Sequence, residues 1–204
     1  MGDVIHTVDV DVDVQTAYNQ WTQFEEFPRF MEGVESVEQL DDRRLMWKVD
    51  IAGIDREFET EITEQTPDQR IAWTSTSGVE QGGVVTFHRL DDHETRVTLQ
   101  MVFEPEGVVE QLADLTGAVS MRVKGDLERF KEFIEERRVE TGAWRGEIAV
   151  DDRYPPTDFE KMQSEAENID LDLEDTPLDE DLAISAHAIE DGVEQYRQHD
   201  NTDR

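Results

Sequence analysis

The chain has 204 residues, with 51 Asp and Glu against 19 Lys and Arg and a formal net charge of −32. This charge repels phosphate backbones, so we expect no nucleic-acid partner. There is no cysteine for disulfides or thiolate chemistry. No apolar run approaches the ~18 residues of a membrane span, and the N-terminus lacks the features of a signal peptide. We therefore expect a cytoplasmic protein with one domain and an appendage.

The kind of charge is informative as well as its amount. Acids are spread along the whole chain, and only four of the basic residues are lysines. Molar salt would screen the repulsion between so many carboxylates. The composition therefore predicts a halophilic protein, of haloarchaeal origin, for a salt-rich cytosol. An acidic protein of an ordinary cytosol is the alternative.

The first half of the chain changes period several times. Residues 4–12 alternate as a half-buried strand does, whereas residues 14–24 and 27–31 have helical spacing, and Gly33 ends the second short helix. Strand-like runs separated by turn residues follow at 34–40, 45–51, 54–62, 71–75, 85–87 and 97–103. Successive strands with short turns predict an antiparallel meander.

A long amphipathic helix is predicted over residues 106–140, with apolar residues every three or four positions. Gly117 and Gly125 inside it indicate a bend or a close approach. We expect a folded domain over 1–146 and an acidic, largely solvated tail over 147–204. An amphipathic helix near 177–197 would either dock weakly on its own domain or bind a protein partner.

Several separated segments resemble a known family. They read YNQWT (18–22), FEEFPRFMEGV (24–34), GIDREF (53–58), IAW (71–73), GVVTF (83–87), TRV (95–97) and DLERFK (126–131). Over about residues 3–146, the chain resembles the polyketide cyclase/dehydrase branch of the START-like (SRPBCC) superfamily, which also includes coenzyme Q-binding START proteins. The resemblance and the order of elements imply an α+β helix-grip fold, a curved antiparallel sheet wrapped around a long C-terminal helix.

This fold implies a cavity between sheet and helix, and we expect it to bind a hydrophobic small molecule such as a quinone, an isoprenoid or a polyketide. The alternatives are an aromatase/cyclase or dehydratase acting on a polyketide-like substrate, and an interaction module acting through the acidic tail. We expect no cofactor. Enzymatic activity is left open, because nothing in the sequence identifies a catalytic residue.

Candidate ligand-binding residues follow from the predicted inward faces of the strands and the helix. They are Trp47, Arg56, Phe58, Thr60, Trp73, Phe87, Met101, Leu115 and Val119. Period-two alternation places Arg56 in register with core positions, where it would anchor a carbonyl, phenolate or carboxylate of the ligand. A structural ion pair, or a side chain reaching out from the strand end, explains Arg56 equally well. The aromatic residues can be plain core as well as pocket walls.

The five histidines show no spacing typical of a metal site, so none is predicted. His6 lies in the apolar register of the first strand. A histidine at a strand end is more often a structural residue with its hydrogen bonds satisfied than a catalytic acid or base. Nucleophile-elbow, phosphate-loop and dinucleotide-binding motifs are absent from the sequence.

Overall fold

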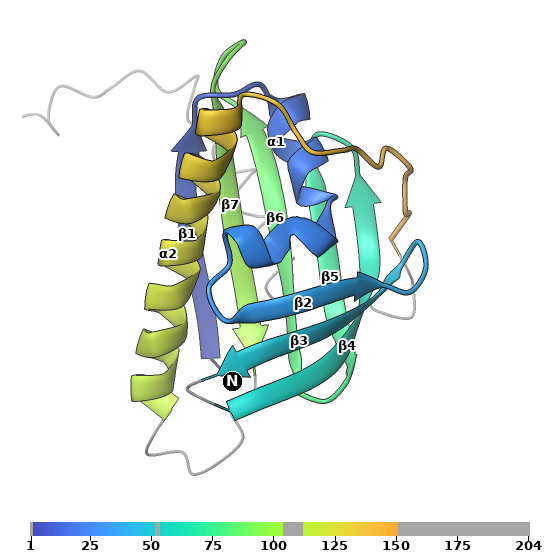
Figure 1. The fold of residues 1–204 in the computed structure, drawn as a ribbon, viewed down its shortest axis with the longest axis vertical. Coiled ribbons are helices and arrows are strands. Elements are labelled where there is room, and N and C mark those ends of the chain that lie inside the picture. The colour runs from blue at the N-terminus through green and yellow to red at the C-terminus, as the bar shows by residue number, and fades with distance from the viewer. Residues whose placement is uncertain (1, 52–53, 104–111, 151–204) are drawn as a thin grey trace, which may run out of the picture. The chain divides into compact units, whose positions relative to one another are not determined.

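Seven antiparallel strands form one curved sheet in the order β1-β7-β6-β5-β4-β3-β2 (Figure 1). The computed structural model describes residues 2–51, 54–103 and 112–150, which all lie within one compact unit, Met1–Tyr154. The strands are β1 (Gly2–Val10), β2 (Val34–Gln39), β3 (Arg44–Ile51), β4 (Ile54–Thr66), β5 (Arg70–Ser77), β6 (Gln81–Arg89) and β7 (Thr95–Phe103). Strands β2 to β7 pair with their sequence neighbours, and β1 closes the order against β7. The predicted meander is confirmed.

A single long helix, α2 (Leu112–Arg137), lies along β1 at one side of the sheet (Figure 1). Over residues 116–137, where its side chains are described, its buried residues are Val123, Leu127, Phe130 and Ile134, spaced by three or four as an amphipathic helix requires. This arrangement is the predicted α+β helix-grip fold. Residues 104–111 lie outside the described part, so the expected start of the helix at 106 is not described.

Two short helices follow β1 and cover one end of the sheet's inner face. In α1 (Val14–Trp21), Asp13 caps the first turn by accepting the Thr16 N–H at 3.0 Å. The next helix, η1 (Phe24–Arg29), is a 3-10 helix that buries Phe24 and Phe27. The rings of Trp21 and Phe27 meet edge to face at 5.4 Å between centroids. Together the two helices supply large aromatic side chains to the core.

Helix α2 is tied to the segment after η1 by a carboxylate and a guanidinium. Asp126 accepts the Glu32 N–H at 2.8 Å, and the Nε of Arg129 donates to the Phe30 carbonyl at 3.1 Å. Burial raises the pKa of Asp126, although the Glu32 N–H and Arg129 oppose the change. Gly33 follows with φ +79°, a left-handed conformation that favours glycine. The two short helices are thereby held against α2.

The segment after α2, residues 138–150, runs back across α1 and β4, and we call it the strap. Its Ile148 exchanges two backbone hydrogen bonds with Gln65 on β4, at 2.8 and 2.9 Å. Arg145 forms a two-pronged ion pair with Asp68 at 2.7 and 2.9 Å. Ile148 is 4% exposed and belongs to the core cluster. Core packing thus reaches two residues beyond the boundary predicted at 146.

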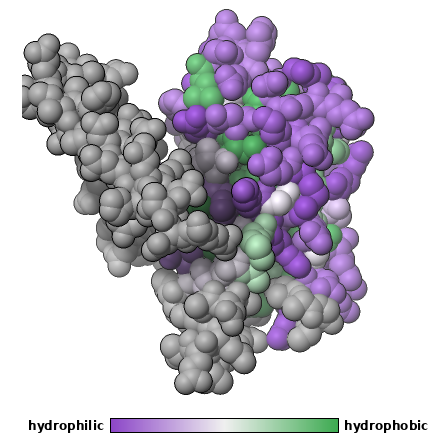
Figure 2. All heavy atoms as spheres, turned by 90° about the vertical axis from the view of Figure 1, so that its left-hand side faces the viewer, coloured by the Kyte–Doolittle hydropathy of each residue, from purple (hydrophilic) through white to green (hydrophobic). Residues whose placement is uncertain are grey.

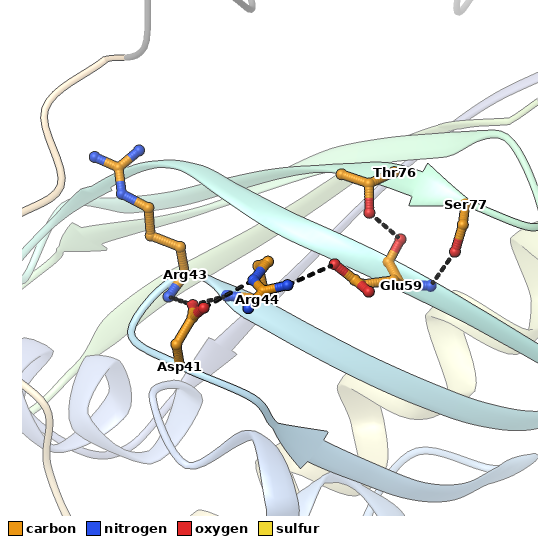
Figure 3. Close-up of polar contacts among 6 residues, drawn as sticks. All are labelled: Asp41, Arg43, Arg44, Glu59, Thr76 and Ser77. Atoms are coloured by element: carbon orange, nitrogen blue, oxygen red, sulfur yellow. Dashed lines mark hydrogen bonds and ion pairs between the residues drawn. The ribbon is translucent and has the colours of Figure 1, made fainter.

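The described part of the face shown in Figure 2 is mainly hydrophilic. Figure 2 shows the face with α2 and β1, and in its described part hydrophobic residues appear only in small, scattered patches. Figure 3 shows a polar cluster at the β2–β3 turn, where Asp41 accepts the backbone N–H groups of Arg43 and Arg44 at 2.9 and 2.8 Å. These two N–H groups and the Arg44 guanidinium lower the pKa of Asp41 to about 2.

Candidate ligand-binding site

Among the described residues, the large side chains on the inner face of the sheet are fully buried at one end and half-buried toward the other. At the buried end, which we call the closed end, Trp21, Phe30 and Phe130 are at most 3% exposed, and their ring centroids lie 5.3 to 6.4 Å apart. Toward the N-terminal half of α2, large side chains on the same face stay half-buried. We call this set the open end: Trp47, Trp73, Met101 and Val119, of which Trp47 also meets the Phe27 ring of η1 at 5.8 Å. A large apolar side chain that remains partly exposed beside a finished core is available for contact with a ligand.

Trp73 lies over a glycine of the neighbouring strand. It pairs with Gly83 on β6, and a Cβ placed on Gly83 would lie 2.6 Å from Cζ2 of the Trp73 ring. The Trp73 indole donates to Oε1 of Gln81 at 3.2 Å, which fixes the ring's orientation. Gly83 in turn pairs with Met101 on β7. The glycine therefore makes room for a flat aromatic surface between two strands.

Trp47 forms a second aromatic surface on β3. Its ring stacks on Phe58 of β4 at 6.0 Å with an interplanar angle of 12°. Its indole donates to the Thr60 hydroxyl at 2.8 Å. Thr60 has no exposed surface, and its hydroxyl oxygen already accepts the hydrogen bond from Trp47. Phe58 and Thr60 thus position Trp47.

The other predicted site residues divide into three cases. Phe87 is 6% exposed and meets Tyr18 of α1 edge to face at 5.5 Å, so it belongs to the closed end. Arg56 pairs with the buried Val49, which confirms that the two share a face, yet the Arg56 side chain is exposed at the end of β4. The exposed side chain agrees with the alternative of an arginine that reaches out from the strand end, because β4 extends past the core at this point. The side chain of Leu115 lies outside the described residues.

A polar pair joins β1 to α2 beside the open end. Nε2 of His6 lies 2.8 Å from the hydroxyl oxygen of Ser120, and both side chains are half-buried. The neighbours of His6 on the same face, Val4 and Val8, are 4% and 7% exposed. His6 is thus engaged across the helix–sheet interface. Ser120 was not predicted, although it precedes Val123 by three positions and so continues the inward stripe of α2.

The described residues contain neither a candidate metal site nor a helix that could span a membrane. Among them, His, Asp and Glu side chains nowhere form a group of three that could hold a metal ion. No helix in the described ranges has an apolar stretch long enough to cross a bilayer.

Comparison with known families assigns the chain to one class of protein. Residues 10–134 match the family described as "Polyketide cyclase / dehydrase and lipid transport". The chain belongs to this family. It is also 56% identical, over 149 residues, to an uncharacterized 17.2 kDa protein of Streptomyces lincolnensis, an alignment that covers 72% of this chain and 99% of the relative.

Solved structures agree on the fold. A protein of Deinococcus radiodurans is 27% identical with a TM-score of 0.55, covering 67% of this chain and 99% of that one. A START superfamily protein of Mycobacterium smegmatis is 17% identical with a TM-score of 0.57, covering 66% and 99%. The Zhui aromatase/cyclase of Streptomyces sp. R1128 is 20% identical with a TM-score of 0.59, covering 70% and 98%. The START-like assignment is supported, whereas neither the coenzyme Q-binding branch nor a haloarchaeal origin gains support from these relatives.

Proposed function

We propose that the domain binds a hydrophobic small molecule against the open end of the inner face. The observation that carries this proposal is the half-buried state of Trp47, Trp73 and Met101 on a face whose other end is closed. Burial of apolar area is worth about 25 cal/mol per Å², so two indole faces and a thioether can supply most of the affinity. The family's "lipid transport" description and its START relative agree with a hydrophobic ligand.

Quinones, isoprenoids and polyketides are the proposed ligand classes, because each offers a long apolar or planar surface to stack on the indoles. Arg56, exposed at the end of β4, is proposed to contact a polar group of the ligand at the rim. Leu115 is proposed to face the ligand from α2. The acidic tail as a docking segment for a protein partner also stays a prediction, since residues 151–204 lie outside the described part.

The experiment compares two tryptophans that are both half-buried. Trp73 belongs to the open end, whereas Trp144 lies in the strap, where its backbone N–H donates to the Thr22 hydroxyl at 3.0 Å. We measure binding of 2-ethylnaphthalene, a neutral apolar probe, by fluorescence titration. Trp73→Ala should weaken binding about tenfold, a free-energy loss of ~1.4 kcal/mol, and Trp144→Ala should leave it unchanged. Equal effects of the two variants, or no binding by the wild type, would contradict the proposal.

A native mass spectrum of the protein purified from its own cells tests the same proposal without a chosen probe. A bound lipid, quinone or polyketide would add mass to the folded charge states, and Trp73→Ala should reduce the liganded fraction.

An aromatase/cyclase or dehydratase is the second candidate. It is favoured by His6, an acid–base group on the inner face, and by the structural likeness to the Zhui aromatase/cyclase. Incubation with a poly-β-ketone thioester tests it: cyclised product that disappears in His6→Gln would favour an enzyme. Binding without turnover would favour a carrier.

A further inference from the structure

His6 is a polar residue on an otherwise apolar stretch of β1. The inward-facing residues before and after it, Val4 and Val8, are buried. Its Nε2 lies 2.8 Å from the Ser120 hydroxyl. Among the described residues, the His6 side chain and the Ser120 side chain form this hydrogen bond with each other and no other. Polar groups in such surroundings normally satisfy their hydrogen-bonding capacity.

The pair carries one polar hydrogen more than its own bond consumes. A neutral imidazole has one N–H, and a hydroxyl has one O–H. If Nε2 donates to Ser120, the hydroxyl hydrogen remains free to donate elsewhere. If Ser120 donates to Nε2, the hydrogen on Nδ1 remains. One donor is therefore left in either tautomer, and it requires an acceptor.

The pair borders the open end directly. On β7, Leu99 is paired with His6, and the next residue on the same face is Met101. On α2, Ser120 follows Val119. A molecule stacked on Trp73 and in contact with Met101 and Val119 would therefore have the leftover donor at its edge.

From this juxtaposition we propose that His6 and Ser120 bind an acceptor oxygen, the carbonyl of a ketone or quinone, on an otherwise apolar ligand. The inference rests on the proposed function and narrows its ligand classes: His6 and Ser120 favour a carbonyl compound over an isoprenoid hydrocarbon. It assigns recognition to β1 and α2, whereas the sequence directed attention to Arg56 on β4.

The test uses two probes of nearly equal shape, 2-acetylnaphthalene and 2-ethylnaphthalene, which differ in one carbonyl oxygen. The ratio of their dissociation constants is compared between variants, so that their different affinities for water cancel. His6→Leu/Ser120→Ala removes both donors and should reduce the preference for the ketone about fivefold, the value of one neutral hydrogen bond, with the hydrocarbon still bound. His88→Leu, which replaces an exposed histidine on β6, is the control and should leave the ratio unchanged.

A second measurement on the wild type does not depend on the folding of the double variant. The infrared carbonyl stretch of bound 2-acetylnaphthalene should lie at lower wavenumber than in cyclohexane, because a hydrogen bond weakens the C=O bond. If both probes bind, an unshifted band or an unchanged ratio would overturn the role of His6 and Ser120 and leave the proposed function standing. If neither probe binds, the proposed function fails and this inference with it.

Discussion

Replacing Gly83 by alanine should destabilise the domain and disturb the open end together. The new Cβ would lie 2.6 Å from the Trp73 ring and 2.6 Å from the backbone carbonyl oxygen of Gln100. The carbonyl belongs to β7, paired with β6, so it cannot move without disturbing the sheet. Overpacking of this kind costs about 1–3 kcal/mol. Displacement of the Trp73 ring should also weaken binding of 2-ethylnaphthalene.

A second glycine provides the matched control. A Cβ on Gly117 of α2 would meet nothing within 4 Å, so the predicted close approach at this glycine is wrong. Gly117→Ala should stabilise the helix by up to ~1 kcal/mol, because glycine is the poorer helix former. The same substitution should therefore have opposite signs at the two positions.

Urea unfolding at fixed KCl measures both changes. With an m value of ~2 kcal/mol per M, the midpoint should fall by about 0.5–1.5 M for Gly83→Ala and rise by up to ~0.5 M for Gly117→Ala. An unchanged midpoint for Gly83→Ala would refute the close packing of Trp73 on β6. Unchanged probe binding in a destabilised Gly83→Ala would mean that Trp73 does not contact the ligand.

Three further predictions concern the rest of the described chain. Ile148→Ala should lower the free energy of unfolding by about 2 kcal/mol or more, whereas Val150→Ala, at a position 54% exposed, should change it by less than ~0.5 kcal/mol; equal effects would mean that the strap adds nothing to the core. The pKa of Asp41 is about 2 in the folded state against a usual 3.8, so its contribution to the stability of the fold is complete above pH 3.8 and disappears as the pH falls through about 2. An NMR titration of Asp41 with a midpoint near 4 would contradict the turn geometry. The melting temperature should rise between about 0.1 M and 2 M KCl because salt screens carboxylate repulsion, and equal values would count against salt adaptation.

Much of the architecture could be predicted because it depends on local periodicity. Alternation in β4 correctly placed Phe58, Thr60 and Ile62 on one face, and the three-to-four spacing in α2 marked its buried residues. A period reports which way a side chain points, but not how far the neighbouring elements extend to cover it. Arg56 shows the difference: alternation predicted its face correctly, but could not decide between a buried and an exposed guanidinium.

Contacts between strands could not be predicted, because bulges alter the register. The β4–β5 pairing shifts between Glu59 and Thr60 and again between Ile62 and Glu64. Counting along the chain therefore cannot show which residues of β4 and β5 lie opposite each other. The β5–β6 pairing has no such shift, and the Trp73–Gly83 pair required the structure because the turn between these two strands sets their register. The strap was missed for a related reason. Its hydrogen bonds come from irregular backbone and single side chains, so no period marks it.

Side-chain size along the described part of α2 parallels the burial of the inner face. The C-terminal half of the helix presents Phe130 and Ile134, neither with any exposed surface, to the aromatic residues of α1 and η1. Toward its N-terminal end the described stripe carries the smaller, half-buried Thr116, Val119 and Ser120, and Trp73 on β5 is half-buried as well. Large residues complete the core where the short helices meet α2, and much of the aromatic burial lies at that end. Binding can therefore change through substitutions at the open end while the closed end keeps the domain folded.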